Sequence, residues 1–114
     1  MEFTREEIDA RTRSVAVTGE LVGSSGTQLV RVVRAALDEG IERVVIDLTG
    51  MSFMDSGGLA ALVAAWSAAG ERGCGFAIVL KPESHAARSL ELRGVSGVFS
   101  VAGSREAALK MLDE

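Results

Sequence analysis

The residues best suited to chemistry lie in one short segment, Met54-Asp55-Ser56-Gly57-Gly58, between an apolar run and an amphipathic one. Asp55 or Ser56 could cap a helix by accepting a hydrogen bond from a backbone N–H. The two glycines each disfavour a helix by about 1 kcal/mol relative to alanine, so they need another reason to be there. We expect close approach of another backbone, from this chain or from a partner. The segment is therefore either a plain helix cap or a functional surface.

Ser56 also has the properties of a modification site. A phosphate on its hydroxyl would lie at a helix N-terminus, where free N–H groups and the helix dipole favour negative charge. The modified domain should stay folded, while an added charge of about −1.5 to −2 near Asp55 would act on anything docked there. This placement permits a switch that alters docking without unfolding the protein.

The other candidate sets for catalysis or ligand binding are weak. The single cysteine, Cys74, and the single histidine, His85, flank one predicted strand, which favours a half-buried thiol and a solvated imidazole over a catalytic pair. Two such ligands are too few for a structural zinc site, and we expect no metal and no cofactor. Residues 19–26, GELVGSSG, lack the lysine and the spacing of a phosphate-binding loop, which favours a flexible capping loop. Asp47 is expected to bond nearby backbone rather than to act as an acid or base.

Composition narrows the class of protein. The chain has 114 residues, is 47% hydrophobic and carries a formal net charge of −4. Its length suits one domain over residues 1–114, and its acidic balance disfavours direct contact with nucleic acid. No apolar run reaches the roughly 18 residues of a membrane helix, and the charged N-terminus lacks the core of a signal peptide. With one cysteine and no internal disulfide, the expected location is the cytoplasm.

Short β-branched runs predict four or five strands. The first two should pair antiparallel through a turn near residues 9–13, with Gly19 ending the second. The later runs suit strands that are buried on both faces. The clearest predicted strands are residues 15–18, 43–48, 76–80 and 98–101.

About four helices alternate with these strands. Ser24 or Ser25 should cap the first, Gly40 should close it, and Ser104 should cap the last. The two middle helices are predicted over residues 59–69 and 84–93. Alternating strands and helices predict an α/β fold with right-handed crossovers and a mostly parallel sheet. Loops after the carboxyl ends of parallel strands gather at one edge, so residues 18–26, 49–58 and 81–85 should be neighbours.

The segment VVIDLTGMSFMDSGGLAALVAAW, residues 44–66, resembles the signature of STAS domains, specifically of the bacterial anti-sigma factor antagonists. Residues 15–21, 71–101 and 104–109 resemble further pieces of the same family, in the same order. The resemblance covers about residues 13 to 112. It implies a single STAS domain with four or five strands, about four helices and an antiparallel first strand, and it implies no catalysis.

The resemblance also implies a binding switch. The unmodified domain would bind an anti-sigma factor that is also a serine kinase, and this would free a sigma factor, as in stress response or sporulation. The kinase would phosphorylate the serine that matches Ser56 and so release the domain, and a PP2C-type phosphatase would restore it. We expect the partner to bind at Glu20, Leu21, Ser24, Ser25, Met54, Asp55, Ser56, Gly57 and Gly58.

Two positions depart from the family pattern. Gly57 stands where the family often has serine or threonine, which bears on the kinase contact. Val22 stands where the family often has aspartate after Gly-Glu-Leu, which bears on the choice of partner. The alternative function is a non-catalytic STAS scaffold or a module that binds a nucleotide or lipid. An enzyme is disfavoured because no nucleophile and base are paired in the sequence.

Overall fold

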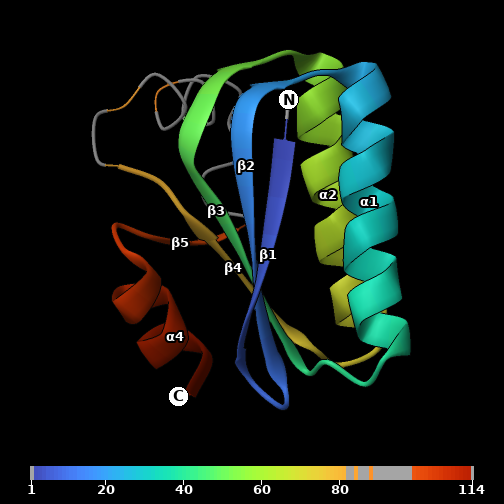
Figure 1. Ribbon diagram of the computed structural model, residues 1–114, viewed down its shortest axis with the longest axis vertical. Coiled ribbons are helices and arrows are strands. Elements are labelled where there is room, and N and C mark those ends of the chain that lie inside the picture. The colour runs from blue at the N-terminus through green and yellow to red at the C-terminus, as the bar shows by residue number, and fades with distance from the viewer. Residues whose placement is uncertain (1, 82–83, 85–87, 89–98, 114) are drawn as a thin grey trace.

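One sheet of five strands forms the centre of the computed structural model, which describes residues 2–81, 84, 88 and 99–113 (Figure 1). The strands lie side by side in the order β1-β2-β3-β4-β5. β1 pairs antiparallel with β2 and all other neighbours pair parallel, which confirms the predicted fold class. The bounds are β1 (Glu2–Asp9), β2 (Thr12–Leu21), β3 (Arg43–Met54), β4 (Gly75–Val79) and β5 (Ser100–Ala102).

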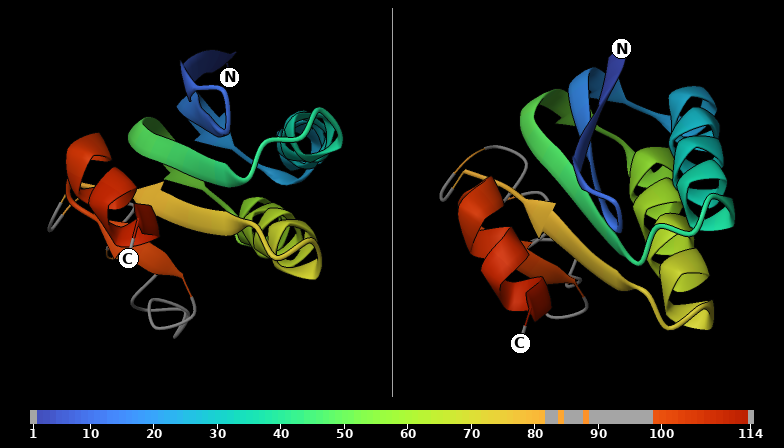
Figure 2. Two further views of the ribbon diagram at one scale, coloured as in Figure 1. Left: turned by 90° about the horizontal axis from the view of Figure 1, so that it is seen from below. Right: turned by 60° about the horizontal axis from the view of Figure 1, so that its bottom comes forward.

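Helices cover both faces of this sheet. α1 (Gly23–Asp38) and α2 (Ser56–Glu71) lie side by side on one face, and α4 (Arg105–Asp113) packs on the other face beside β4 and β5 (Figure 2). The helix expected over residues 84–93 falls outside the described residues apart from two positions. Within the described ranges, no helix is long and apolar enough to cross a membrane.

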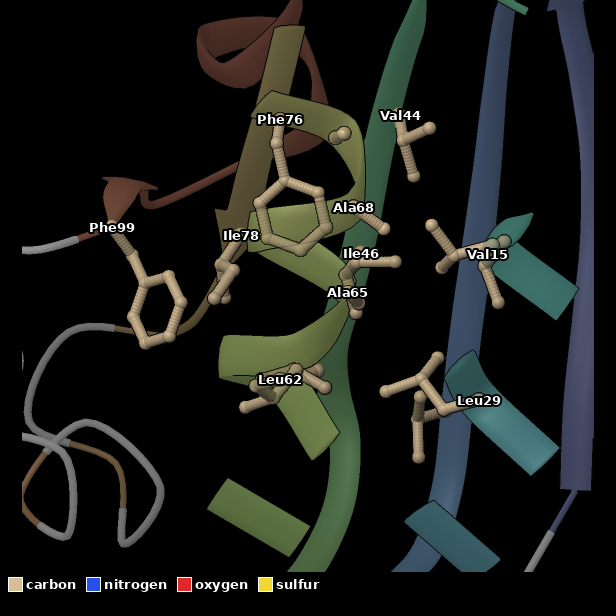
Figure 3. Packing of buried hydrophobic residues seen from close by; sticks show 14 of the residues in the cluster. Val15, Leu29, Val44, Ile46, Leu62, Ala65, Ala68, Phe76, Ile78 and Phe99 are labelled. Carbon is tan, nitrogen blue, oxygen red and sulfur yellow. The ribbon is translucent and has the colours of Figure 1, made fainter. Parts of the chain in front are cut away.

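The main core lies between the sheet and the α1–α2 pair. Val15, Ile46 and Ile78 project from three neighbouring strands toward Leu29 of α1 and Leu62 of α2 (Figure 3). All five side chains are fully buried, and each such burial contributes about 1.5–3 kcal/mol. A smaller cluster on the opposite face joins the sheet to α4 through Val45, Ala77, Val79, Ala102 and Ala108. The first cluster holds α1 and α2 against the sheet.

β2 and β3 run further than their sequence patterns predict. Gly19 does not end β2, because the strand continues to Leu21 with Gly19 at a φ of 91°. β3 does not stop at Leu48 but continues to Met54. The pairing shifts register twice along residues 16–20 of β2, and each shift leaves one extra residue on β3. Such bulges break the two-residue alternation by which a strand is recognised in a sequence.

The helix ends are capped largely as predicted. Gly40 follows α1 with a φ of 94°, the left-handed conformation expected of it. Before α4, the Ser104 hydroxyl accepts a hydrogen bond from the Ala107 N–H at 3.1 Å. Both residues therefore fulfil their predicted roles.

Ion pairs gather at the end of the sheet where the parallel strands begin. The side chain of Arg13 is only 8% exposed, and its guanidinium contacts the carboxylates of Glu7 and Glu39, the latter at 2.8 Å. The hydrogen bond from Arg13 lowers the pKa of the Glu39 carboxyl, and the two carboxylates, Glu39 foremost, raise the pKa of Arg13. Further pairs at this end join Arg11 to Glu42, Arg72 to Asp38 and Arg43 to Asp113.

Candidate functional site

The candidate site is the opposite edge, where β2 and β3 end and α1 and α2 begin (Figure 1). Leu21 and Met54, the last residues of the two strands, are directly paired. The Asp55 N–H also donates to the Leu21 carbonyl at 3.3 Å. These contacts confirm that the segments after β2 and β3 are neighbours. The third segment expected here, residues 81–85, lies mostly outside the described part of the chain.

Asp55 is the N-cap of α2. Its backbone is extended, with φ −99° and ψ −176°, and its Oδ1 accepts a hydrogen bond from the Gly58 N–H at 2.8 Å. The capping role predicted for Asp55 or Ser56 therefore belongs to Asp55. α2 begins at Ser56 and not at Leu59, so the predicted loop between strand and helix shrinks to one residue.

Ser56 is the first residue of α2, and its side chain is exposed. Its hydroxyl makes no hydrogen bond to any of the described residues. Asp55 already supplies the cap, so the Ser56 hydroxyl has no structural task in this part of the molecule. It is positioned by a rigid helix and faces solvent.

Gly57 and Gly58 are explained by close approach of the chain's own backbone. A Cβ on Gly57 would lie 2.7 Å from the Cα of Gly23 in α1, closer than real Cβ atoms come. A Cβ on Gly58 would lie against the Leu21 carbonyl, 2.8 Å from its carbon. The contact anticipated from the two glycines is therefore internal. It also accounts for glycine at position 57, because a larger residue there would push α1 away from α2.

The start of α1 differs from the prediction. Residues 23–26 are helical rather than a loop, and the N-cap is Val22, whose side chain has no acceptor. Ser25 lies at the third helical position, where its Oγ accepts from the Val22 N–H at 2.9 Å. Neither Ser24 nor Ser25 is thus the N-cap. Glycine and serine misled the prediction because packing against α2 favours a helix despite their weak propensity.

Exposure divides the residues predicted to bind a partner. The side chain of Leu21 is fully buried and that of Met54 is 4% exposed, so both support the edge from beneath and cannot touch a partner directly. Gly58 is buried as well. The residues that remain at least partly accessible are Glu20, Ser24, Ser25, Asp55, Ser56 and Gly57. These six come from two segments that are far apart in the sequence.

Phe53 belongs to this edge but is absent from the residues predicted to bind a partner. Its side chain is 44% exposed at the penultimate position of β3, opposite Glu20 in the pairing with β2. The sequence placed Phe53 in the predicted loop over residues 49–58, next to Met54, but gave no reason to assign it a contact with the partner. The available signal was its position only three residues before Ser56.

Other polar residues have structural roles. Asp47 Oδ1 accepts from the backbone N–H and the hydroxyl of Thr49, at 2.9 and 2.7 Å, as its predicted role of bonding nearby backbone requires. The Cys74 thiol is half-buried and lies 3.6 Å from the Ile41 carbonyl. His85 is outside the described residues, so the predicted relation of the two stays a prediction. Within the ranges described, no three acidic, histidine or cysteine residues cluster to hold a metal.

The arrangement defines a class of protein: a small α/β domain with a helix-borne serine at the carboxyl edge of its sheet. A family model described as "Mlab, STAS domain" matches residues 4–104. This chain belongs to the STAS domain family.

Relatives of this chain include proteins named as anti-sigma factor antagonists. BtrV of Bordetella bronchiseptica, which bears that name, is 32% identical over 109 residues, covering 95% of this chain and 91% of the relative. The crystal structure of an anti-sigma factor antagonist from Mycobacterium paratuberculosis is 25% identical with a TM-score of 0.85, covering 99% of this chain and 94% of that one. The Bacillus cell fate determinant SpoIIAA, in its phosphorylated form, shares the fold, with 20% identity and a TM-score of 0.69 over 96% of this chain and 98% of that one. Proteins of this class are regulators and not catalysts, so the chain is not an enzyme.

Proposed function

We propose that this chain is an anti-sigma factor antagonist whose docking is controlled at Ser56. The unphosphorylated form binds an anti-sigma factor that is also a serine kinase, and a sigma factor is thereby freed for transcription. Phosphorylation of Ser56 releases the kinase, and a PP2C-type phosphatase returns the domain to its binding form. These steps take place in the cytoplasm.

The observation that carries this proposal is the exposed hydroxyl of Ser56 on the first turn of α2. Asp55 caps the helix, so a change at Ser56 leaves the cap in place. Ser24 of α1 is exposed on the neighbouring helix start, which Gly57 holds close. A partner that covers Ser56 therefore meets the starts of both helices as one surface.

A phosphate on Ser56 is compatible with the fold. It would lie at a helix N-terminus, where a negative charge contributes about 0.3–1 kcal/mol of stability. The site already has the carboxylates of Asp55 and Glu20, which belong to the same edge. The phosphate would add to these charges, and their combined negative charge would act on a docked partner.

The relatives support the same role. BtrV and the Mycobacterium protein are both named as anti-sigma factor antagonists. The Bacillus protein is described in a phosphorylated form, which supports the compatibility of this fold with phosphorylation.

The test is affinity capture from the native cytoplasm with tagged Ser56→Ala and Ser56→Asp proteins. Ser67→Ala serves as the matched control, because it removes an exposed hydroxyl from a later turn of the same helix, outside the predicted binding surface. We expect Ser56→Ala and Ser67→Ala to capture the same anti-sigma factor, identified by mass spectrometry, and Ser56→Asp to lose it. The free energy of unfolding of all three proteins should lie within about 0.5 kcal/mol of that of the wild type, since substitutions of exposed residues have small effects.

When the captured protein is purified and supplied with ATP, it should transfer one phosphate to the wild type and none to Ser56→Ala. Capture of the same proteins by the alanine and aspartate forms would contradict the switch. Loss of the anti-sigma factor from all forms, with a nucleotide or lipid bound instead, would favour the alternative of a ligand-binding STAS module.

A further inference from the structure

Phe53 is the most exposed large apolar side chain in the described part of the molecule. It is 44% exposed, whereas the next are between 36% and 39%. Its position is also unusual, because it lies three residues before Ser56 and pairs with Glu20 across the two strand ends. An exposed aromatic ring thus belongs to the same edge as the exposed serine.

The exposure of Phe53 follows from a bulge in the backbone. Between the pairs Gly19–Met51 and Glu20–Phe53, β3 contains one extra residue, Ser52. Side chains alternate between faces along a regular strand, so without the bulge Phe53 would share the face of Met51, which packs against the core. The bulge reverses this alternation, and bulges commonly re-aim side chains near functional sites.

The same bulge turns Met54 into the core, where it is 4% exposed. The strand therefore buries the flexible methionine and exposes the phenylalanine next to it. Phe53 is 44% exposed, so part of the stabilisation from burying its side chain is withheld from folding and is available to a binding partner.

We infer that Phe53 is the apolar anchor of the Ser56 surface and inserts into a non-polar pocket on the anti-sigma factor. The inference rests on the proposed function and adds the chemistry of the contact. Residues 18–27 and 49–59 contain two carboxylates, Glu20 and Asp55, and no lysine, arginine or histidine. This charge disfavours an anionic lipid surface, so a protein pocket is the occupant that fits an apolar ring among small polar residues.

A buried Phe53 also explains how a phosphate three residues away would release the partner. A phosphate at the rim of an apolar contact must lose water when the partner closes over it, and that loss is unfavourable. Desolvation acts at contact distance, whereas repulsion between separated charges is screened by salt. Release by desolvation should therefore persist at high salt.

The experiment measures the dissociation constant of the anti-sigma factor captured by Ser56→Ala, purified and titrated against variants of the full chain. Phe53→Ala should weaken binding by about 30-fold or more, as expected for an aromatic anchor. Phe53→Leu should recover most of the affinity. Met111→Ala is the matched control, because Met111 is 39% exposed on α4, away from this edge, and its removal should leave binding unchanged.

The same titration is repeated with Ser56→Asp at about 0.1 M and about 1 M salt, where the screening length falls from about 10 Å to about 3 Å. We expect the weakened binding to persist at both. If Phe53→Ala and Met111→Ala bind the anti-sigma factor with equal affinity and have equal melting temperatures, the docking role of Phe53 is overturned while the proposed function stands. Recovery of Ser56→Asp at high salt would overturn release by desolvation.

Failure of the proposed function gives a different result. In that case Ser56→Ala captures no anti-sigma factor, and the docking role of Phe53 is rejected with it. Binding of the wild type, but not of Phe53→Ala, to vesicles of phosphatidylcholine and phosphatidylglycerol would assign the ring to a lipid surface instead.

Discussion

The two ends of the parallel strands are held together by different means. At the end where the strands begin, four arginines bind carboxylates on other elements, and Arg13 joins β1, β2 and the residue after α1. At the end where they finish, residues 18–27 and 49–59 make no ion pair with any described residue. Glycines there bring backbones into contact, and Asp55 caps α2.

The two ends therefore differ in how well they tolerate small shifts of the backbone. Long charged side chains tolerate small shifts, since an ion pair can be kept over a range of positions. The glycine contacts between Gly57 and Gly23, and between Gly58 and Leu21, allow almost no shift. An edge fixed by backbone contact needs no ion pairs, so Phe53 and Ser56 stay exposed there, where the proposed partner would dock.

The largest effect is expected from Gly58→Ala. The added Cβ would press on the Leu21 carbonyl, which is backbone and cannot rotate away. We expect the free energy of unfolding to fall by about 3 kcal/mol and the Tm by about 12 °C. Thermal and denaturant unfolding measure this.

Gly70→Ala is the control for that substitution, because it lies in the same helix with no atom within 4 Å of the new Cβ. It should be neutral or stabilise by up to about 1 kcal/mol. If both variants melt like the wild type, the close contact does not hold this edge.

Arg13→Met tests the opposite end. Each of the two ion pairs contributes about 1 kcal/mol at most, because the carboxylates are more than half exposed, so the variant should lose at most about 2 kcal/mol at neutral pH. Arg11→Met, whose pair with Glu42 is exposed on both sides, should change stability by less than about 0.5 kcal/mol. Equal losses would show that burial of Arg13 is irrelevant.

The effect of Arg13→Met should also depend on pH. Arg13 lowers the pKa of Glu39 below its ordinary value of 4.5 in the folded protein. The stability that this pair contributes is complete above that value and is lost as the pH falls through the lower, folded-state pKa. The difference in Tm between wild type and variant should therefore shrink at pH values below the ordinary pKa of the Glu39 carboxyl. A constant difference down to strongly acidic pH would contradict the assignment.

Asp55→Ala should lower the free energy of unfolding less than either Gly58→Ala or Arg13→Met. Loss of the hydrogen bond to the Gly58 N–H should cost about 1 kcal/mol, and Asp55→Asn should restore most of it, because asparagine is also a good N-cap. Unfolding in urea at neutral pH distinguishes the three proteins. If the Asp55→Asn protein is as unstable as the Asp55→Ala protein, Asp55 stabilises α2 through its charge and not through the cap hydrogen bond.

The sequence predicted the fold better than the edge. Continuous apolar runs such as residues 43–48 and 76–80 predicted strands buried on both faces, and the structure confirms strands there and the antiparallel first pair. Residues 49–54 escaped assignment to β3 because two bulges remove the alternation. Residues 23–26 and 56–58 were missed as helix because the mutual packing of α1 and α2 overrides the weak propensity of glycine and serine.

The position of Ser56 on the first turn of α2 determines what the proposed kinase would have to recognise. The later turns of α2 bury Leu62 and Ala65 against the sheet, so the serine cannot be drawn out as an extended peptide without disturbing the core. The segment that flanks it in space, residues 20–25, comes from a distant part of the sequence. A short peptide copied from residues 50–60 would lack the surface that residues 20–25 form beside the start of α2. A kinase that recognises this surface would leave unfolded copies of the chain unmodified.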